Sequence, residues 1–426
     1  MKISKNAIIA LDGGGTNLRI VIRDQVTNEE LFSKKVKYGT NLSSVGDKNQ
    51  ALENIKKLIL DGFECVRQKG YKISAIGLSS AGTEVKENVV MLKQALEDAS
   101  KKIQESDIQA SLNPPLCVVT NDIDILLGKD VSIAGVCGTG SILAYRSEEK
   151  DENGNRIIKT VDGLGHTIGD YGSGYYIGDH VINRVLRIFN AGAYIDSNGK
   201  EVEVDPNKSN LVKRVLILLA KDAKENRDGI NVDDMEPSEL VRYYEDTLEQ
   251  LKTGELTLQQ LVADATNVKS MKDGVEIENK YDKAVVAKYA GFLIADVEDP
   301  ALDDILEKAA TEYALSIKAA IKKGKLQDEP NINVLLNGGI VQHNPKYKER
   351  IEAIVKEKYP NVTINVIDPE KEEAVDYTIK YMKELLEQRQ KQKYEGLPII
   401  EFPPSGAIRG AGKFQSLDGR DIDEIA

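Results

Sequence analysis

The sequence predicts an α/β fold built from a duplicated unit, because one order of elements occurs twice along the chain of 426 residues. In each copy an apolar strand, a glycine-rich turn and a returning strand follow one another, at 7–22 and again at 131–146. A chain of this length can hold two or three domains, each with its own hydrophobic core. We therefore expect an N-terminal domain over residues 1–129 and a C-terminal domain over residues 130–426.

The first copy reads as three strands in a meander, followed by alternating helices and strands. Its predicted elements are strands at 7–11, 18–23 and 30–36, a helix at 50–69, a strand at 75–78, a helix around 89–102 and a strand at 116–119. Apolar side chains at helical spacing from Leu52 to Val66 indicate the first helix, and Gly70 marks its end. The last strand leads through Thr120-Asn121-Asp122 into a short helix.

The second copy repeats the three strands and resumes after a long insertion. Its predicted elements are strands at 131–136, 142–146 and 157–161, a strand at 333–336, a helix at 345–358 and a strand at 362–366. From about 186 to 300 the sequence becomes helical, acidic and rich in lysine, which indicates a helical insertion with a solvated face. Residues 384–394 are polar, and we expect the terminal helix to pack back on the first domain.

The turn between the first two strands carries an aspartate, three glycines and two small polar residues. Its sequence is Asp12-Gly13-Gly14-Gly15-Thr16-Asn17. Glycines without Cβ let backbone N–H groups approach an anion, and the aspartate can hold a hydrated Mg²⁺ against the same phosphates. The alternative is a plain hairpin turn, because glycine-rich loops often join strands. A second such turn, Cys137-Gly138-Thr139-Gly140-Ser141, follows the first strand of the second copy.

Composition disfavours several classes of partner. The 57 basic and 69 acidic side chains leave a net charge of −12, which disfavours a nucleic-acid or anionic-membrane surface. The three cysteines, Cys65, Cys117 and Cys137, show no CxxC spacing and indicate buried thiols in a reducing cytosol. We see no signal peptide and no apolar run near the roughly 20 residues of a membrane span. We therefore expect a cytoplasmic protein.

Two common nucleotide-binding fingerprints are absent. The nearest approach to a Walker loop, GxxxxGK[ST], is the segment 406–413, but Phe414 follows where Ser or Thr would ligate Mg²⁺. A Rossmann GxGxxG also fails, because Gly178 comes one position too late after Gly172 and Gly174.

The segments 12–17, 137–141 and 163–178 occur in an order that resembles the N-acetylglucosamine kinases. More broadly, they resemble the BadF/BadG/BcrA/BcrD ATPase family within the actin, sugar-kinase and Hsp70 superfamily. The resemblance runs from residue 7 to about 412 and implies two ribonuclease-H-like domains that flank a nucleotide cleft. It also implies ATP and Mg²⁺ as cofactors, a sugar as the small-molecule partner, and a homodimer.

The resemblance assigns the nucleotide-binding residues position by position. They are Gly13, Gly14, Gly15, Thr16, Asn17, Gly138, Thr139, Gly140, Ser141, Gly338, Gly339, Gly406 and Ala407. The first five match one phosphate loop, the next four match a second, and the last four match the loops that hold adenosine. Asp12 would hold Mg²⁺ through water. A turn or a helix cap is the alternative explanation for each glycine.

The same resemblance assigns the catalytic and sugar-binding residues. Asp122 matches a catalytic aspartate that accepts the proton of a sugar hydroxyl as its oxygen attacks the γ-phosphorus. A helix N-cap is the alternative for Asp122, since aspartate is preferred there. Asn41, Gly165 and Asp170, together with Asp122, match the sugar ligands, and a turn-forming role is the alternative for Asn41.

Two departures from the family pattern lie beside Asp170. Leu164 stands where kinases of this kind carry Trp, and Tyr171 stands where they carry an acidic residue. An aromatic face over the sugar is therefore missing, which leaves the sugar and the phosphorylated hydroxyl open. His166 keeps the family position but has no ligand partners in the sequence, so we interpret it as a packing residue.

Three hypotheses follow for the function. The leading one is ATP-dependent phosphorylation of a hexose or amino sugar, with N-acetylglucosamine first among the acceptors. The second is an ATPase that activates acyl-CoA dehydratases, which needs cysteines to hold an iron–sulfur cluster. The third is a non-catalytic sugar or nucleotide sensor, against which Asp12 and Asp122 argue.

Overall fold

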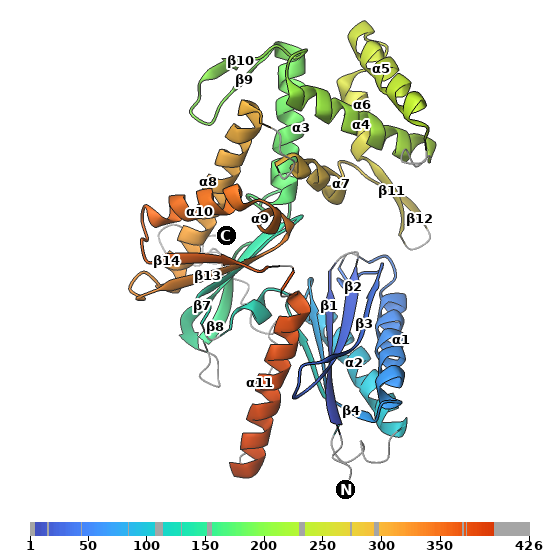
Figure 1. Cartoon of the computed structure of the whole chain (residues 1–426), viewed down its shortest axis with the longest axis vertical. Coiled ribbons are helices and arrows are strands. Elements are labelled where there is room, and N and C mark those ends of the chain that lie inside the picture. The colour runs from blue at the N-terminus through green and yellow to red at the C-terminus, as the bar shows by residue number, and fades with distance from the viewer. Residues whose placement is uncertain are drawn as a thin grey trace, which may run out of the picture. The chain divides into compact units, whose positions relative to one another are not determined.

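The computed structural model describes residues 5–14, 17–43, 45–83, 85–106, 114–128, 130–150, 156–229, 235–272, 275–293, 298–368, 370–371 and 373–395. The chain divides into two compact units (Figure 1). Unit 1 holds residues 1–134, 144–159 and 368–426, and unit 2 holds residues 135–143 and 160–367. The division thus groups residues 368–426, at the C-terminal end, with the N-terminal residues.

A five-stranded sheet forms the centre of unit 1, in the order β3-β2-β1-β4-β5. The strands are β1 (Lys5–Gly13), β2 (Leu18–Asp24), β3 (Glu30–Val36), β4 (Tyr71–Ser80) and β5 (Leu116–Thr120). The three-strand meander is antiparallel, whereas β4 and β5 run parallel to β1. The carboxyl ends of β1, β4 and β5 therefore meet at one edge, where ligands of open α/β sheets usually bind.

Helices cover both faces of this sheet, which explains why β1 is apolar at consecutive positions. Ile9 and Leu11 pack toward helices α1 (Lys48–Arg67) and α2 (Lys86–Ser106). Ile8 and Ala10 pack on the other face against helix α11 (Ala374–Glu395) (Figure 1).

Helix α11 lies close to β4 because of a glycine. A Cβ added at Gly77 would lie 2.9 Å from the Cγ atom of Met382, so any larger residue would push the helix away. The start of α11 is also held by charge, because Arg19 pairs with Glu373 and Arg23 Nη1 lies 2.6 Å from Asp376 Oδ1. Packing and charge together fix α11 against unit 1.

The second five-stranded sheet has the order β14-β13-β6-β7-β8. Its strands are β6 (Ile133–Cys137), β7 (Ser141–Lys150), β8 (Arg156–Asp162), β13 (Ile332–Asn337) and β14 (Val362–Val366). Helices α3 (Gly174–Ala191), α8 (Pro300–Gly324), α9 (Gly339–His343) and α10 (Pro345–Lys356) belong to unit 2. Tyr347 is fully buried, and its hydroxyl donates to the Gly172 carbonyl at 2.8 Å, with the Ala309 carbonyl as a second acceptor within reach at 3.2 Å.

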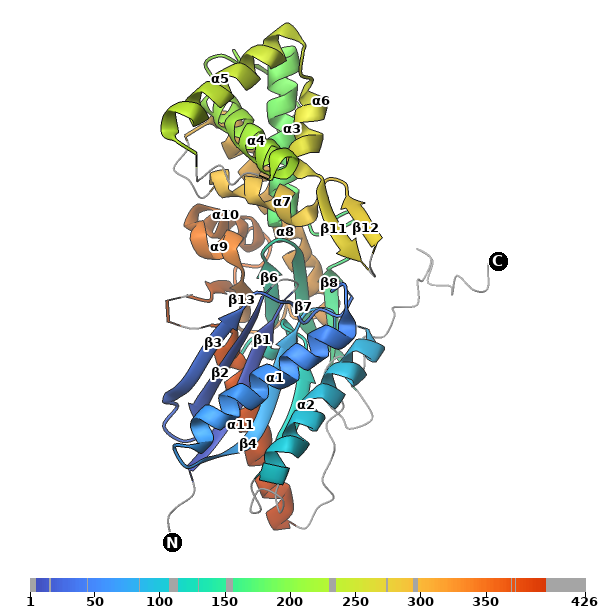
Figure 2. The same cartoon turned by 90° about the vertical axis from the view of Figure 1, so that its right-hand side faces the viewer.

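The expected insertion contains helices and also two hairpins that helical periodicity does not predict. Figure 1 labels the strands of both hairpins, and Figure 2 shows β11 and β12 from another side. Its elements are β9 (Ala193–Ile195), β10 (Glu201–Glu203), α4 (Asn210–Asp228), α5 (Pro237–Thr253), α6 (Leu258–Thr266), β11 (Val268–Lys272), β12 (Val275–Asn279) and α7 (Lys283–Lys288). The first hairpin has a local cause. Gly192 ends α3 in a left-handed conformation, and the Asp196 carboxylate then accepts from the amides of Asn198 and Lys200.

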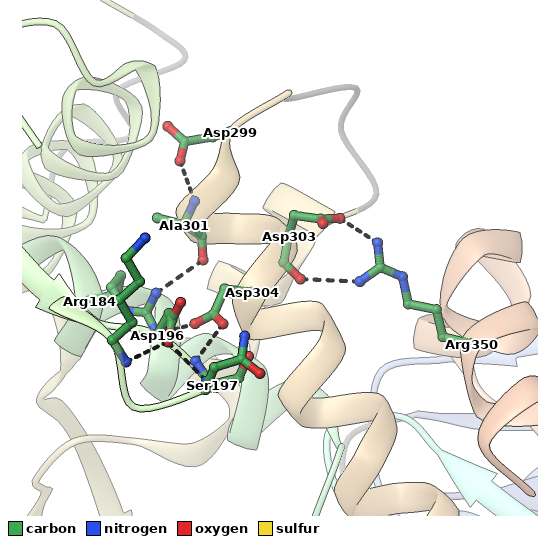
Figure 3. A network of polar contacts seen from close by, with 10 residues as sticks. Arg184, Asp196, Ser197, Asp299, Ala301, Asp303, Asp304 and Arg350 are labelled. Atoms are coloured by element: carbon green, nitrogen blue, oxygen red, sulfur yellow. Dashed lines mark hydrogen bonds and ion pairs between the residues drawn. The ribbon is translucent and has the colours of Figure 1, made fainter. Parts of the chain in front are cut away.

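An ion-pair network at the start of α8 holds the first hairpin and α3 together (Figure 3). Arg184 of α3 donates to Asp304 Oδ2 at 2.7 Å, and the other oxygen of Asp304 accepts from the Ser197 amide at 2.7 Å. Arg350 of α10 pairs with Asp303 in the same turn of α8. About a tenth of each side chain is exposed in the Arg184–Asp304 pair, so water screens it weakly.

Candidate active site

The first glycine turn follows β1 and is fixed by two neighbouring loops of unit 1. Gly14 donates its amide to the Asn17 carbonyl at 3.0 Å, and its own carbonyl accepts from the Thr40 amide at 2.9 Å. A Cβ added at Gly13 would lie 2.1 Å from Thr40 Oγ1, so only glycine fits there. Gly15 and Thr16 lie outside the described residues.

Asp12 lies near the end of β1, and its carboxyl group is a weaker acid than usual. Its carboxyl is half-buried, and Ser79 Oγ donates to it at 3.5 Å. Burial, followed by the nearby negative charge of Asp122, raises its pKa from 3.8 to about 6. A buried carboxylate beside a second negative charge fits a divalent cation, whose charge would relieve the repulsion. The residues here therefore fit Mg²⁺.

A pocket of about 300 Å³ opens beside this turn within unit 1. It is lined by Asp12, Gly14, Asn17, Arg19, Lys35, Glu373 and Val375. The sequence predicts Asp12, Gly14 and Asn17 here, but it does not predict the neighbouring ion pair of Arg19 and Glu373. Glu373 lies more than 350 positions after Arg19, so no local pattern could have linked them.

Asp122 follows β5 at the same sheet edge, one residue before the cap position of the short helix that comes next. The turn after β5 is closed by its neighbour Asn121, whose Oδ1 accepts from the Ile123 amide at 3.0 Å. The short 3₁₀ helix over Asp124–Leu126 has Ile123 at its cap position and no side-chain cap bond. Asp122 is half-buried. Its catalytic role stays a prediction.

Asn41 has the turn-forming role that we gave as its alternative. Its Oδ1 accepts from the Ser43 amide at 3.0 Å, which makes an Asx turn. The same oxygen would lie 2.1 Å from a Cβ added at Gly82, a residue with a φ of +80°. The loop after β3 and the loop after β4 therefore meet at Asn41. Its contact with a sugar stays a prediction.

The second glycine turn joins β6 to β7 and belongs to unit 2. The Gly138 amide donates to the Gly140 carbonyl at 3.0 Å, which closes the turn on itself. At the start of α3 the Gly174 amide donates to the Gly138 carbonyl at 2.7 Å, and the Tyr175 amide donates to the Thr139 carbonyl at 3.1 Å. The start of α3 is thus attached directly to the turn.

The end of β13 also reaches this turn. Gly338 has a φ of +117°, and a Cβ added there would lie 2.4 Å from the Cys137 carbonyl oxygen. Gly339 follows as the first residue of α9. The structure therefore places Gly338 behind the second turn, at a position that only glycine can occupy. Gly406 and Ala407, the other expected adenosine contacts, lie outside the described residues.

Asp170 is buried beside the second turn, where it contacts a backbone amide and a lysine. Its backbone is left-handed, with a φ of +57°, and its Oδ1 accepts from the Ser141 amide at 3.2 Å. Its Oδ2 lies 2.6 Å from Nζ of Lys283, a residue of the insertion. Sequence reasoning missed Lys283, because it belongs to no recognisable motif and lies 113 residues away.

The loop between β8 and α3 presents apolar side chains to solvent. Leu164 is 67% exposed and Tyr171 is 39% exposed, although both are large and apolar or aromatic. Gly165 turns the loop with a φ of +86°, and its carbonyl accepts from the Ile168 amide at 3.3 Å. The His166 ring contacts the Tyr175 ring edge-on at 4.8 Å, as a packing residue would.

Two of the three cysteines lie in unreactive surroundings. Burial raises the pKa of the Cys117 thiol to about 12 and also raises the pKa of the Cys137 thiol. Cys65 is exposed on α1. Among the residues that the structure describes, no three His, Cys, Asp or Glu side chains group to hold a metal ion. In the same part of the chain, no helix has the length and apolar content to cross a membrane.

Comparison with known proteins identifies relatives of this chain. The sequence model of the BadF/BadG/BcrA/BcrD ATPase family matches residues 9–375. An N-acetylmuramic acid/N-acetylglucosamine kinase from Clostridium acetobutylicum is 31% identical over 188 residues, which cover 43% of this chain and 54% of that protein. An N-acetyl-D-glucosamine kinase from Dictyostelium discoideum is 27% identical over 192 residues, which cover 43% and 56%.

The chain thus spans about half the length of the curated relatives it matches. A solved structure of a hexokinase aligns with 89% of this chain and 85% of that one, at 16% identity and a TM-score of 0.43.

Proposed function

Because this chain belongs to the BadF/BadG/BcrA/BcrD ATPase family, we propose that it is an ATP-dependent kinase of a hexose or amino sugar. N-acetylglucosamine is the first acceptor to consider, because both curated relatives carry it in their names. The observation that carries the proposal is the pair of carboxylates at the edge of the unit 1 sheet. Asp12 lies near the end of β1 and Asp122 follows β5, and burial together with the charge of Asp122 raises the pKa of Asp12.

The proposed reaction uses the two carboxylates differently. Asp122 accepts the proton of a sugar hydroxyl as the hydroxyl oxygen forms a bond to the γ-phosphorus. The bond between the γ-phosphorus and the bridging oxygen breaks, and ADP leaves. Asp12 is proposed to hold Mg²⁺ through water, and Mg²⁺ when bound would neutralise charge on the phosphates. The glycine turns of unit 1 and unit 2 are proposed to donate backbone N–H groups to the phosphates.

The proposed sugar ligands are Asn41, Gly165, Asp170 and Asp122. Amide and carboxylate groups suit hydroxyls, because a buried group left without its partner lowers affinity strongly. Leu164 and Tyr171, the two departures from the family pattern, are exposed, so the choice of acceptor sugar stays open. The finer assignments belong to the same proposal: ribonuclease-H-like domains of the actin-like kind, Mg²⁺ as the cation, a cytoplasmic location and a homodimer.

A panel of hexoses and amino sugars in a coupled ADP-release assay tests this function. One sugar should stimulate ADP release strongly, and Asp122→Asn should abolish that stimulation while ATP still binds. Asp130→Asn is the matched control, because Asp130 is an exposed aspartate a few residues further on. ATP hydrolysis that no sugar stimulates would contradict the proposal and favour the activator type of ATPase.

A further inference from the structure

Lys283, the first residue of α7 in the insertion, lies against the second glycine turn. We infer that Lys283 binds the phosphate chain of the nucleotide at residues 138–141, and that Asp170 is its counter-ion while the site is empty. This inference rests on the proposed function, because it assumes that the turn binds phosphate and that Asp170 binds sugar. Lys283 belongs to the insertion, and no sequence motif assigns it a role.

The helix that carries Lys283 is docked rigidly on α3. A Cβ added at Gly178 of α3 would lie 2.0 Å from the Val286 carbonyl oxygen, so the glycine admits the backbone of α7. Val286 is fully buried. The Tyr281 hydroxyl donates to Asp179 Oδ1 of α3 at 3.0 Å, and the Asp282 amide donates to the Thr266 carbonyl at 2.8 Å. Lys283 therefore extends from a fixed backbone.

The ammonium group of Lys283 lies directly over the turn. A Cβ added at Gly140 would lie 2.8 Å from Lys283 Nζ and 2.9 Å from Asp170 Oδ2. Glycine at 140 thus leaves room for the ion pair to reach the turn. The ammonium carries three N–H donors, and Asp170 accepts from it at 2.6 Å. The side chain of Lys283 is 33% exposed, whereas only 4% of the Asp170 side chain is exposed.

The negative charge around the second glycine turn explains why a cation is needed there. The protein carries a net charge of −12, and the buried Asp170 stands beside the turn, so an incoming phosphate meets a negative field. Lys283 brings a positive charge to this turn, because its Nζ lies beside Gly140 and Asp170. An ammonium that turns from Asp170 to phosphate would bind the nucleotide and release the carboxylate for sugar hydroxyls.

Calorimetric titration of the full-length protein with MgATP, MgADP and AMP tests the inference. Lys283→Met should weaken ATP and ADP binding by roughly tenfold or more, and leave AMP binding within about twofold. Lys283→Arg should restore most of the loss, since it keeps the charge. The matched control is Lys280→Met, which removes an exposed lysine just before α7 and should change nothing. An equal loss for all three nucleotides would overturn the inference.

An Asp170→Asn background separates direct contact from simple neutralisation of Asp170. If Lys283 contacts phosphate, Lys283→Met costs a similar factor in ATP affinity whether it is introduced alone or together with Asp170→Asn. If the loss disappears in the Asp170→Asn background, then Lys283 only neutralises the carboxylate, and the inference is wrong.

The unmodified protein offers a second measurement that does not depend on variants folding. Acetic anhydride labelling of Lys283, read by mass spectrometry against Lys280, should fall when ATP is added and should not fall with AMP. Labelling of Lys283 that ATP leaves unchanged would contradict the inference.

If the unmodified protein phosphorylates a sugar while Lys283→Met binds ATP normally, this inference alone fails. If Lys283→Met loses ATP affinity but no sugar stimulates ADP release, the proposed function fails instead.

Discussion

Replacing Asp12 with asparagine should stabilise the metal-free protein at pH 7. Burial and the charge of Asp122 raise the pKa of Asp12 from 3.8 to about 6. A carboxyl with a raised pKa in the folded state favours folding below pH 3.8, and that contribution is lost as the pH rises through 6. The shift of the Asp12 pKa from 3.8 to about 6 corresponds to roughly 3 kcal/mol of folding free energy, at about 1.36 kcal/mol per pH unit. The asparagine side chain keeps an oxygen that can accept from Ser79 but carries no charge.

Thermal unfolding with EDTA at pH 7 and at pH 4 measures this effect. The Asp12→Asn variant should unfold at a higher temperature than the parent at pH 7, and the difference should shrink strongly at pH 4. Asp24→Asn is a control for which we expect the opposite change in stability. The Asp24 carboxylate accepts from the amides of Val26 and Thr27, and the bond from Thr27 lowers its pKa. That variant should be less stable at pH 7. An Asp12→Asn protein that is no more stable than the parent at pH 7 would refute the reasoning.

Two further predictions follow from the same geometry. If Asp12 holds Mg²⁺ as proposed, protons compete with the cation, so Mg²⁺-dependent turnover should fall between pH 7 and 5. More Mg²⁺ should move that fall to lower pH, and a fall insensitive to Mg²⁺ contradicts the prediction. Gly338→Ala should lower the free energy of unfolding by about 2–4 kcal/mol through its clash with the Cys137 carbonyl, measured in urea. Gly199→Ala is the control, because Gly199 is also left-handed but has no atom near its added Cβ. This variant should lose only about 1 kcal/mol of unfolding free energy, and equal losses in the two variants would argue against the clash.

Sequence reasoning predicted the features that short segments determine. The strands at 7–11 and 18–23 appear where runs rich in apolar residues predict them, and the strand at 362–366 appears where apolar and polar residues alternate. Both glycine turns join the strands that were expected to flank them. These features are local, so pattern and turn chemistry suffice.

Other features depend on contacts between distant parts of the chain. The approach of α11 to β4 depends on Met382 meeting Gly77, and the charge at the second turn depends on Lys283 meeting Asp170. A periodic pattern reports which face of a helix is apolar, but it does not report which sheet that face meets. The first hairpin of the insertion escaped prediction for a different reason, because β9 and β10 are three residues each and are too short to show alternation.

Direct detection of the phosphorylated product tests the central claim most directly. Incubation with ATP and the stimulating sugar, followed by mass spectrometry, should show one sugar phosphate formed for each ADP released. The same incubation with Asp122→Asn should show neither product, while calorimetry shows that this variant still binds ATP. ADP release without a phosphorylated sugar, or undiminished sugar phosphate from Asp122→Asn, would contradict the account.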